Sequence, residues 1–265
     1  TQRTDRLMWH TKEGYTTIFG ASDGDVYGDN SVSFFALDAN TGAQLWKILE
    51  PQSNNNYYYE AQGLIFNTRL ALGQVEEYYA FPGTSRWVTK LHVTQYRPAF
   101  GSGVVYFPCT DGIYALSMAD GHILWHNANA HGSVAFGDGN VYITDGHALE
   151  ALSASTGTQV WRYTVTSTFT PDLPATVTSH AVYLQPANGH IYAFNPANGA
   201  LLWNVYNGNT YPTPGTPLVY GGYLFTVEYG QLTARLESNG SLQWTAPFQY
   251  VDSGLAVLPG HVSSI

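Results

Sequence analysis

Hydrophobic and polar residues along this chain alternate in short runs that are separated by turns. Runs such as Val104–Phe107 and Val141–Ile143 consist mainly of β-branched and aromatic residues, which strands favour. Dipeptides that contain glycine and are typical of tight turns, such as Asp111-Gly112, follow these runs. The pattern predicts many short antiparallel strands and an all-β fold.

Tryptophan marks an internal repeat. The seven tryptophans are spaced 37, 41, 38, 36, 42 and 41 residues apart. A nearly fixed period of this length is typical of repeat architectures. The series consists of Trp9, Trp46, Trp87, Trp125, Trp161, Trp203 and Trp244.

Glycine and alanine complete the repeat. A glycine lies four residues before six of the tryptophans, at Gly42, Gly83, Gly121, Gly157, Gly199 and Gly240. An alanine lies six residues before five of these glycines, at Ala36, Ala115, Ala151, Ala193 and Ala234, whereas Ala80 precedes Gly83 by only three and predicts a shortened turn. Small alanines let sheets approach, glycine permits positive φ, and tryptophan covers apolar area between units. All three are therefore expected to be structural.

Each repeat contains enough strand and turn signals for four short strands, which is the pattern of a β-propeller blade. We expect a single seven-bladed β-propeller domain over residues 1–265. One blade would be closed by both termini, from the segment around Trp9 and from Gly254–Ile265. No third strand is evident for this blade, so it is three-stranded or the parent chain is longer. The start, without methionine or a signal-peptide pattern, favours a piece excised from a longer chain.

Two repeat segments, Ala36–Trp46 and Ala193–Trp203, resemble the repeat of pyrroloquinoline-quinone-type (quinoprotein-like) propellers. This family includes quinone-dependent alcohol dehydrogenases, a lipoprotein scaffold of bacterial outer-membrane assembly, and sensor domains attached to bacterial serine/threonine kinases. The resemblance implies the propeller fold and an extracytoplasmic, bacterial setting, periplasmic or at the cell surface. It does not choose among these functions, because one fold serves many.

Composition excludes several partners. Ten Lys+Arg against 19 Asp+Glu give a net charge of −9, which repels nucleic acid and anionic lipid. No apolar run is long enough to insert into a membrane within this chain. The single cysteine, Cys109, rules out an internal disulfide and is expected to be a buried structural thiol. We expect a monomer.

Three long loops, Lys47–Glu60, Arg162–Ala175 and Asn204–Gly215, are expected on the propeller face where binding sites usually form. Aromatic rings stack on sugars and amides bond hydroxyls or peptide groups, so these loops suit a protein, peptide or glycan ligand. The alternative is solvated turns with packed tyrosines. The candidate ligand-binding residues are Tyr57, Tyr58, Tyr59, Glu60, Asp172, Asn209 and Tyr211.

A weak metal candidate lies near the N-terminus. Asp23, Asp25 and Asp29, with Gly28, match part of a calcium loop, but Phe34 stands where the loop needs a glutamate. We expect no metal here.

Arg235 departs from the repeat, because it follows Ala234 where other units have an apolar residue. A buried unpaired charge is costly. Either the last unit is shifted by one residue, which puts Leu236 in the apolar place, or Arg235 pairs with an acid such as Glu228 or Glu237. We favour the shift.

These observations favour a non-catalytic binding or scaffold domain, such as a sensor or protein-interaction module. The alternative is a quinone-dependent alcohol dehydrogenase. The resemblance implies that such an enzyme carries a disulfide between adjacent cysteines, a calcium ion and a tryptophan stacked on the quinone. This chain has one cysteine, and its tryptophans belong to the repeat. We therefore expect no enzyme activity, no catalytic residues and no cofactor.

Overall fold

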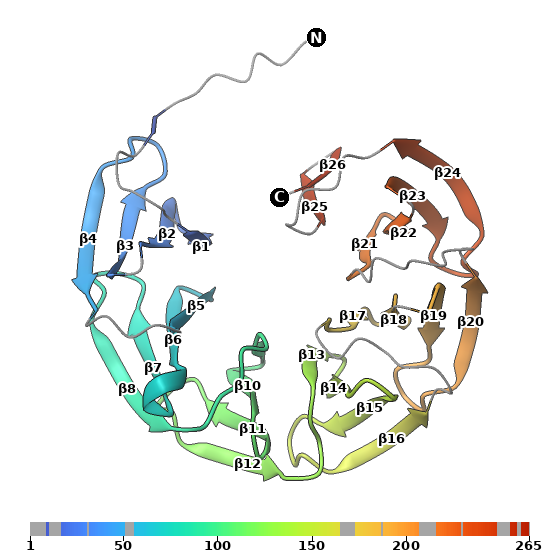
Figure 1. The fold of residues 1–265 in the computed structure, drawn as a ribbon, viewed down its shortest axis with the longest axis horizontal. Coiled ribbons are helices and arrows are strands. Elements are labelled where there is room, and N and C mark those ends of the chain that lie inside the picture. Colours follow the sequence, from blue (N-terminus) through green and yellow to red (C-terminus); the bar gives the residue numbers. More distant parts are fainter. Residues whose placement is uncertain are drawn as a thin grey trace. The chain divides into compact units, whose positions relative to one another are not determined.

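The described residues form six four-stranded antiparallel sheets and one two-stranded hairpin, and in each sheet the strands are joined in chain order (Figure 1). The computed structural model describes residues 9–10, 17–30, 32–50, 56–164, 173–186, 188–206, 216–228 and 230–247, and the backbone of 255–258 and 261–264. The all-β prediction with four strands in each repeat is confirmed for these six sheets. A seventh blade remains a prediction.

The chain separates into two compact units, of which the first contains Thr1–Gln95 and Ser117–His122. Its first sheet consists of β1 (Thr17–Ser22), β2 (Asp25–Asp29), β3 (Ser33–Asp38) and β4 (Gln44–Leu49). Its second consists of β5 (Asn56–Ala61), β6 (Leu64–Arg69), β7 (Gln74–Tyr79) and β8 (Ser85–Lys90), with a short 3-10 helix at Leu70–Leu72. The first strands β1 and β5 are in contact, and Phe34, Ile65 and Tyr78 belong to the core between the sheets.

The second unit contains Tyr96–Leu116 and Ile123–Ile265. It has four four-stranded sheets. The first consists of β9 (Ala99–Gly101), β10 (Val104–Cys109), β11 (Gly112–Ser117) and β12 (Ile123–Asn127), and the second of β13 (Ser133–Gly137), β14 (Asn140–Thr144), β15 (Ala148–Ser153) and β16 (Gln159–Thr164). The third consists of β17 (Thr176–Val177), β18 (Val182–Leu184), β19 (His190–Phe194) and β20 (Leu201–Tyr206), and the fourth of β21 (Leu218–Tyr220), β22 (Tyr223–Glu228), β23 (Gln231–Leu236) and β24 (Leu242–Pro247). A hairpin, β25 (Leu255–Leu258) and β26 (His261–Ser264), follows. The first strands of successive sheets touch, as β13 does with β9 and β17.

The repeat tryptophan, glycine and alanine meet between strands and between sheets, as Trp161 illustrates. Ala151 pairs with Trp161 across β15 and β16, and a bulge follows. The Trp161 indole donates its Nε1–H to the Pro196 carbonyl oxygen at 2.8 Å and packs on Gly199, whose φ is 69°. A Cβ at Gly199 would lie only 2.5 Å from Trp161 Cε3. Equivalent Nε1–H···O bonds are made by Trp9, Trp46, Trp87, Trp125 and Trp203.

A tyrosine in the second strand supports several of these tryptophans, which the sequence reading did not anticipate. Tyr142 pairs with Ala151 in the neighbouring strand, and its hydroxyl approaches the Pro196 oxygen at 3.4 Å. Tyr183 contacts Trp203 in the same way and donates to Glu237 Oε1 at 3.0 Å. Ring and indole of one sheet thus converge on one turn of the next sheet, which fixes how the two sheets pack.

The predicted shortened turn before Gly83 is wrong. Glu77, not Ala80, pairs with Trp87, and it lies six residues before Gly83 as the repeat requires. The unit therefore has the ordinary length but carries a glutamate at the alanine position. A pattern search for alanine misses this, because strand register follows backbone pairing and not residue type.

The favoured one-residue shift of the last unit is also wrong. Ala234 pairs with Trp244 and Arg235 with Leu242, as in the other units. Arg235 is 8% exposed and forms two bonds with Glu228, from Nε to Oε1 at 3.0 Å and from Nη2 to Oε2 at 2.9 Å. The paired-acid alternative is therefore correct, because a bidentate carboxylate supplies the partner that a buried guanidinium needs.

Candidate functional site

The predicted tyrosine-rich loop is largely a strand, which corrects its assignment. Tyr57, Tyr58, Tyr59 and Glu60 all lie in β5 and pair with β6. Side chains in a strand alternate between faces, so Tyr57 and Tyr59 share one face and Tyr58 and Glu60 share the other. Sequence favoured a loop because asparagines precede the tyrosines. The predicted residues Asp172, Asn209 and Tyr211 lie outside the described residues.

The four described candidates differ in accessibility. Tyr57 is 38% exposed, whereas Tyr59 is buried. Tyr58 is half-buried and packs on Phe34 with ring centroids 5.0 Å apart. Glu60 accepts a hydrogen bond from the Gly63 amide at 3.1 Å. Of the four, Tyr57 is the aromatic side chain that offers a surface to a ligand.

A buried polar group lies beside these residues, and we call Glu50, Asn67, Arg69 and Glu76 the Arg69 cluster. Arg69 Nη2 contacts Glu50 Oε1 at 2.7 Å and Glu76 Oε2 at 3.1 Å. Asn67 Nδ2 donates to Glu50 Oε1 at 3.2 Å. Glu50 follows β4 and Arg69 ends β6, so the cluster forms where these two connections meet.

Electrostatics in the Arg69 cluster are dominated by burial. Burial raises the pKa of the Glu50 carboxyl, and the Arg69 guanidinium opposes this rise. Asn67 Oδ1 and Arg69 Nε are buried and have no hydrogen-bond partner among the described residues. One arginine thus compensates two carboxylates, and the arrangement is that of a structural ion pair.

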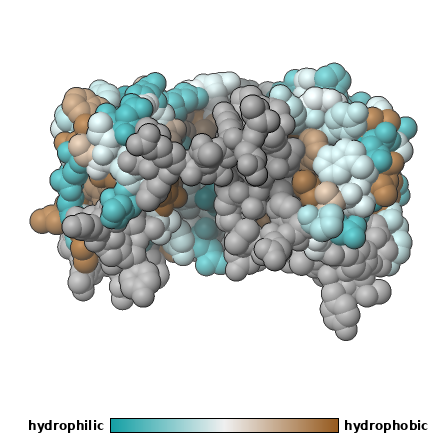
Figure 2. All heavy atoms as spheres, turned by 90° about the horizontal axis from the view of Figure 1, so that it is seen from above, coloured by the Kyte–Doolittle hydropathy of each residue, from teal (hydrophilic) through white to brown (hydrophobic). Residues whose placement is uncertain are grey.

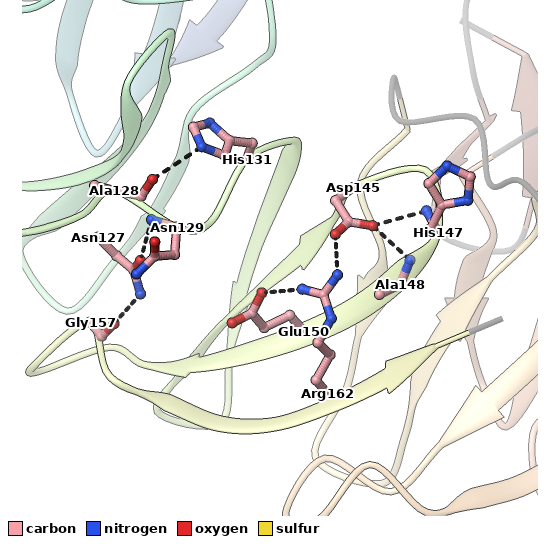
Figure 3. Close-up of polar contacts among 10 residues, drawn as sticks. All are labelled: Asn127, Ala128, Asn129, His131, Asp145, His147, Ala148, Glu150, Gly157 and Arg162. Carbon is pink, nitrogen blue, oxygen red and sulfur yellow. Dashed lines mark hydrogen bonds and ion pairs between the residues drawn. The ribbon is translucent and has the colours of Figure 1, made fainter.

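A second ion-pair group lies in the sheet β13–β16 (Figure 3). Arg162 bridges Asp145 Oδ2 at 2.5 Å and Glu150 Oε2 at 2.9 Å. Burial raises the pKa of Glu150, which Arg162 partly offsets. For Asp145, burial acts in the same direction, but hydrogen bonds from the His147 and Ala148 amides and from Arg162 hold its pKa below the ordinary value.

The third group is Glu77 with Arg86. Glu77 Oε1 pairs with Arg86 Nη1, and Arg86 also donates from Nη1 to the Met118 oxygen and from Nη2 to the Ala119 oxygen, both at 3.1 Å. Burial raises the pKa of Glu77 to about 7, against the opposing charge of Arg86. Sequence reasoning missed this group. The signal was present, since Glu77 occupies the alanine position of the repeat.

The weak calcium candidate does not form a site. Asp25 and Asp29 lie at opposite ends of strand β2, and Asp23 lies in the turn before it with φ of 52°. Four residues of strand separate Asp25 from Asp29 by about 13 Å, which is too far for one ion. In the described part of the chain, no three His, Cys, Asp or Glu side chains gather at a metal-binding distance. Cys109 is buried, as predicted, and burial raises its pKa to about 12.

Many of the exposed apolar residues on the described surface lie in the last strands of their sheets. On the face in Figure 2, hydrophobic residues form small groups between hydrophilic ones. Leu202 and Leu242, in the last strands of their sheets, are examples of exposed aliphatic residues. No helix among the described residues is long and apolar enough to cross a membrane.

Family comparison agrees with this repeat geometry. The model of the PQQ-like repeat family described as "Outer membrane protein assembly factor BamB" matches residues 1–130 and 110–254. The chain belongs to the PQQ-like repeat β-propeller family. This confirms the resemblance seen in the repeat segments Ala36–Trp46 and Ala193–Trp203.

The proteins that this chain resembles in sequence or in fold carry different names and functions. Tetrathionate hydrolase of Acidithiobacillus ferrooxidans is 27% identical over 199 residues, which are 71% of this chain but 37% of that protein, so the match spans little more than a third of the relative. BamB from Moraxella catarrhalis has a similar fold with a TM-score of 0.72 at 19% identity, covering 92% of this chain and 79% of BamB. Quinohemoprotein alcohol dehydrogenase ADHIIG from Pseudomonas putida HK5 has a TM-score of 0.58 at 17% identity, covering 81% and 50%. Similarity at these identities shows the fold alone.

Proposed function

We propose that this chain is a non-catalytic binding or scaffold propeller that presents its connections to a protein, peptide or glycan. The observation that carries the proposal is the pairing of buried ionisable groups. Arg69, Arg162 and Arg235 each hold buried carboxylates. Charges used in this way stabilise the packing of a rigid display platform. An extracytoplasmic location and a monomeric state belong to the same proposal.

Tyr57 is the residue that best tests ligand binding. Its ring is exposed on β5, whereas Tyr58 packs on Phe34 and its loss would also disturb the core. A glycan and peptide array with the whole chain identifies the ligand, and Tyr57→Ala should then weaken binding at least tenfold. Tyr79→Ala is the matched control, because Tyr79 is also exposed but is the last residue of β7, at the opposite end of the second sheet from Tyr57. An empty array, or unchanged binding by folded Tyr57→Ala, contradicts the proposal.

A hydrolase is the second candidate, and the 27% identity to tetrathionate hydrolase favours it. The substrate to test is tetrathionate. Incubation of the chain with tetrathionate, followed by measurement of its consumption, should show no turnover above the buffer rate if the domain only binds. Turnover would replace the non-catalytic proposal with the hydrolase.

A quinone-dependent dehydrogenase is the remaining alternative, since an alcohol dehydrogenase shares the fold. Reconstitution with pyrroloquinoline quinone and calcium should give neither bound-quinone absorbance nor alcohol-dependent dye reduction. Stoichiometric binding with turnover would overturn this expectation.

Closure as a seven-bladed propeller is also part of the proposal. Two observations support it. The hairpin β25–β26 follows the sixth sheet, and its first strand touches β21, as first strands of successive sheets do elsewhere in this unit. Trp244, in the last strand of the sixth sheet, is 44% exposed, and a further sheet would cover it.

A further inference from the structure

Glu77 occupies a buried position at which five other repeats have alanine. Glu77 is 0% exposed and pairs with Trp87 across β7 and β8. Its Oε2 has no hydrogen-bond partner among the described residues. A carboxylate in such a place is poorly compensated when ionised, so it is expected to have a role that alanine cannot fill.

The Glu77 side chain anchors an arginine that reaches a neighbouring turn. Arg86 binds Glu77 Oε1 and donates to the Met118 and Ala119 carbonyl oxygens. Both carbonyls belong to the segment Ser117–His122, which we call the 117–122 turn. Trp87 Nε1 also donates to Met118 at 3.2 Å. Two extra bonds therefore hold this turn, and the charge of Glu77 orients their donor.

We infer that Glu77 and Arg86 form a pH-responsive latch on the 117–122 turn. Ionised Glu77 holds Arg86 on the two carbonyls. When Glu77 takes up a proton, the ion pair is lost, and Arg86, whose side chain is already 18% exposed, turns toward solvent. The turn is then held by the tryptophan and by Thr89, which donates to the Gly121 oxygen at 2.6 Å.

Among the described residues, Arg86 is the charged partner of Glu77, because the other charged groups nearby bind elsewhere. Glu76, next along β7, belongs to the opposite face with Arg69. In the turn, His122 and Asp120 bind each other at 2.6 Å and are exposed. The Tyr79 ring lies under the Arg86 guanidinium, 4.8 Å from its carbon.

The direction of the response follows from linkage. Burial already raises the pKa of Glu77 to about 7, and Arg86 opposes the rise. Release of Arg86 removes this opposing charge while the carboxyl stays buried, so the pKa is higher still in the released state. Protons therefore favour release, and the latch loosens as the pH falls below about 7.

The test follows the Trp87 indole by NMR, assigned with Trp87→Phe, between pH 5.5 and 8.5. The Trp87 Nε1–H resonance should titrate with a midpoint near 7. Exchange of the Gly121 amide, which bonds the Ser117 oxygen at 2.8 Å, should be severalfold faster at pH 6 than at pH 8 after correction for intrinsic rates. Glu77→Gln should abolish the titration and leave exchange fast at both pH values.

Two controls separate the latch from other titrations. His122→Asn removes the histidine of the turn and should leave the Trp87 midpoint unchanged. Glu150→Gln removes another buried carboxyl with a raised pKa and should also have no effect. The inference is overturned if the Trp87 resonance does not titrate, if its titration persists in Glu77→Gln, or if it disappears in His122→Asn.

A second variant keeps the inference testable if Glu77→Gln folds poorly. Glu77→Ala carries the residue of the other repeats. Because the pKa of Glu77 is raised above its ordinary 4.5, its favourable contribution to folding is complete below that value and is lost as the pH rises through about 7. The melting temperature of Glu77→Ala relative to the parent should therefore be higher at pH 8.5 than at pH 5. An equal difference at both pH values contradicts a titrating Glu77.

Discussion

Single residues determine where this repeat protein buries charged side chains and how those charges are paired. Arg235 and Glu77 both stand at repeat positions that are apolar or small in other units, and each has a partner seven to nine residues away in the hairpin. The two carboxyls nevertheless differ. Burial favours a raised pKa for Glu228, but bonds from Arg235, Thr226 and Thr233 outweigh it and lower the pKa. Glu77 has fewer such bonds, and its pKa is raised.

Replacing Arg235 tests the buried pair. Arg235→Leu, the residue of three other repeats, leaves Glu228 ionised and buried, and should lower the free energy of unfolding by about 3–5 kcal/mol at pH 7. Urea denaturation measures the change. Because the pKa of Glu228 is lowered, the pair contributes above the ordinary carboxyl pKa, and its contribution disappears as the pH falls through the folded value.

The matched control is the double variant Glu228→Gln with Arg235→Leu. Removing both charges should recover part of the loss, since no unpaired charge remains. If the double variant is less stable than Arg235→Leu alone, the loss comes from packing and not from the stranded carboxylate.

At the scale of elements, the sheets are joined by one repeated contact. The last strand of a sheet presents a tryptophan, and the third-to-fourth-strand turn of the next sheet presents a glycine and a carbonyl. The glycine has a positive φ, which other residues rarely adopt, and it touches the indole where a Cβ would clash. The contact therefore requires glycine for two reasons. Sheet packing in this protein therefore depends on turns as much as on apolar faces.

Gly199→Ala tests this contact. The new methyl group would lie 2.5 Å from Trp161, and a non-glycine residue at φ of 69° costs about 1–2 kcal/mol by itself. The total loss of unfolding free energy should exceed that figure, as measured by urea denaturation. Gly139→Ala is the control, because Gly139 has φ of 74° and open space around it. Equal losses in the two variants would show that the Trp161 contact has little effect.

At the scale of the whole molecule, the repeat count predicts closure by both termini. An experimental structure should show seven sheets about one axis, with Trp244 covered and the segment around Trp9 in the same sheet as β25 and β26. Six or eight sheets, or termini in different sheets, would contradict the prediction. Solvent quenching offers an independent measure, because covered Trp244 should be protected from acrylamide to the same degree as Trp203.

The sequence by itself determined the all-β class, the four-stranded repeat and its tryptophan, glycine and alanine positions. These follow from local patterns that recur, and recurrence makes chance matches improbable. The sequence failed for Tyr57–Glu60, which it placed in a loop, since the asparagines before them are turn formers.

Tertiary structure alone decided which charges meet. The partners Glu228 and Arg235, or Glu77 and Arg86, are brought together by hairpin register and by side-chain reach, neither of which residue type specifies. Tertiary packing also set the sign of each pKa shift, because burial and the number of hydrogen bonds on a carboxylate are properties of the folded chain. The acid at the alanine position was visible in the sequence, but its burial and its partner were not.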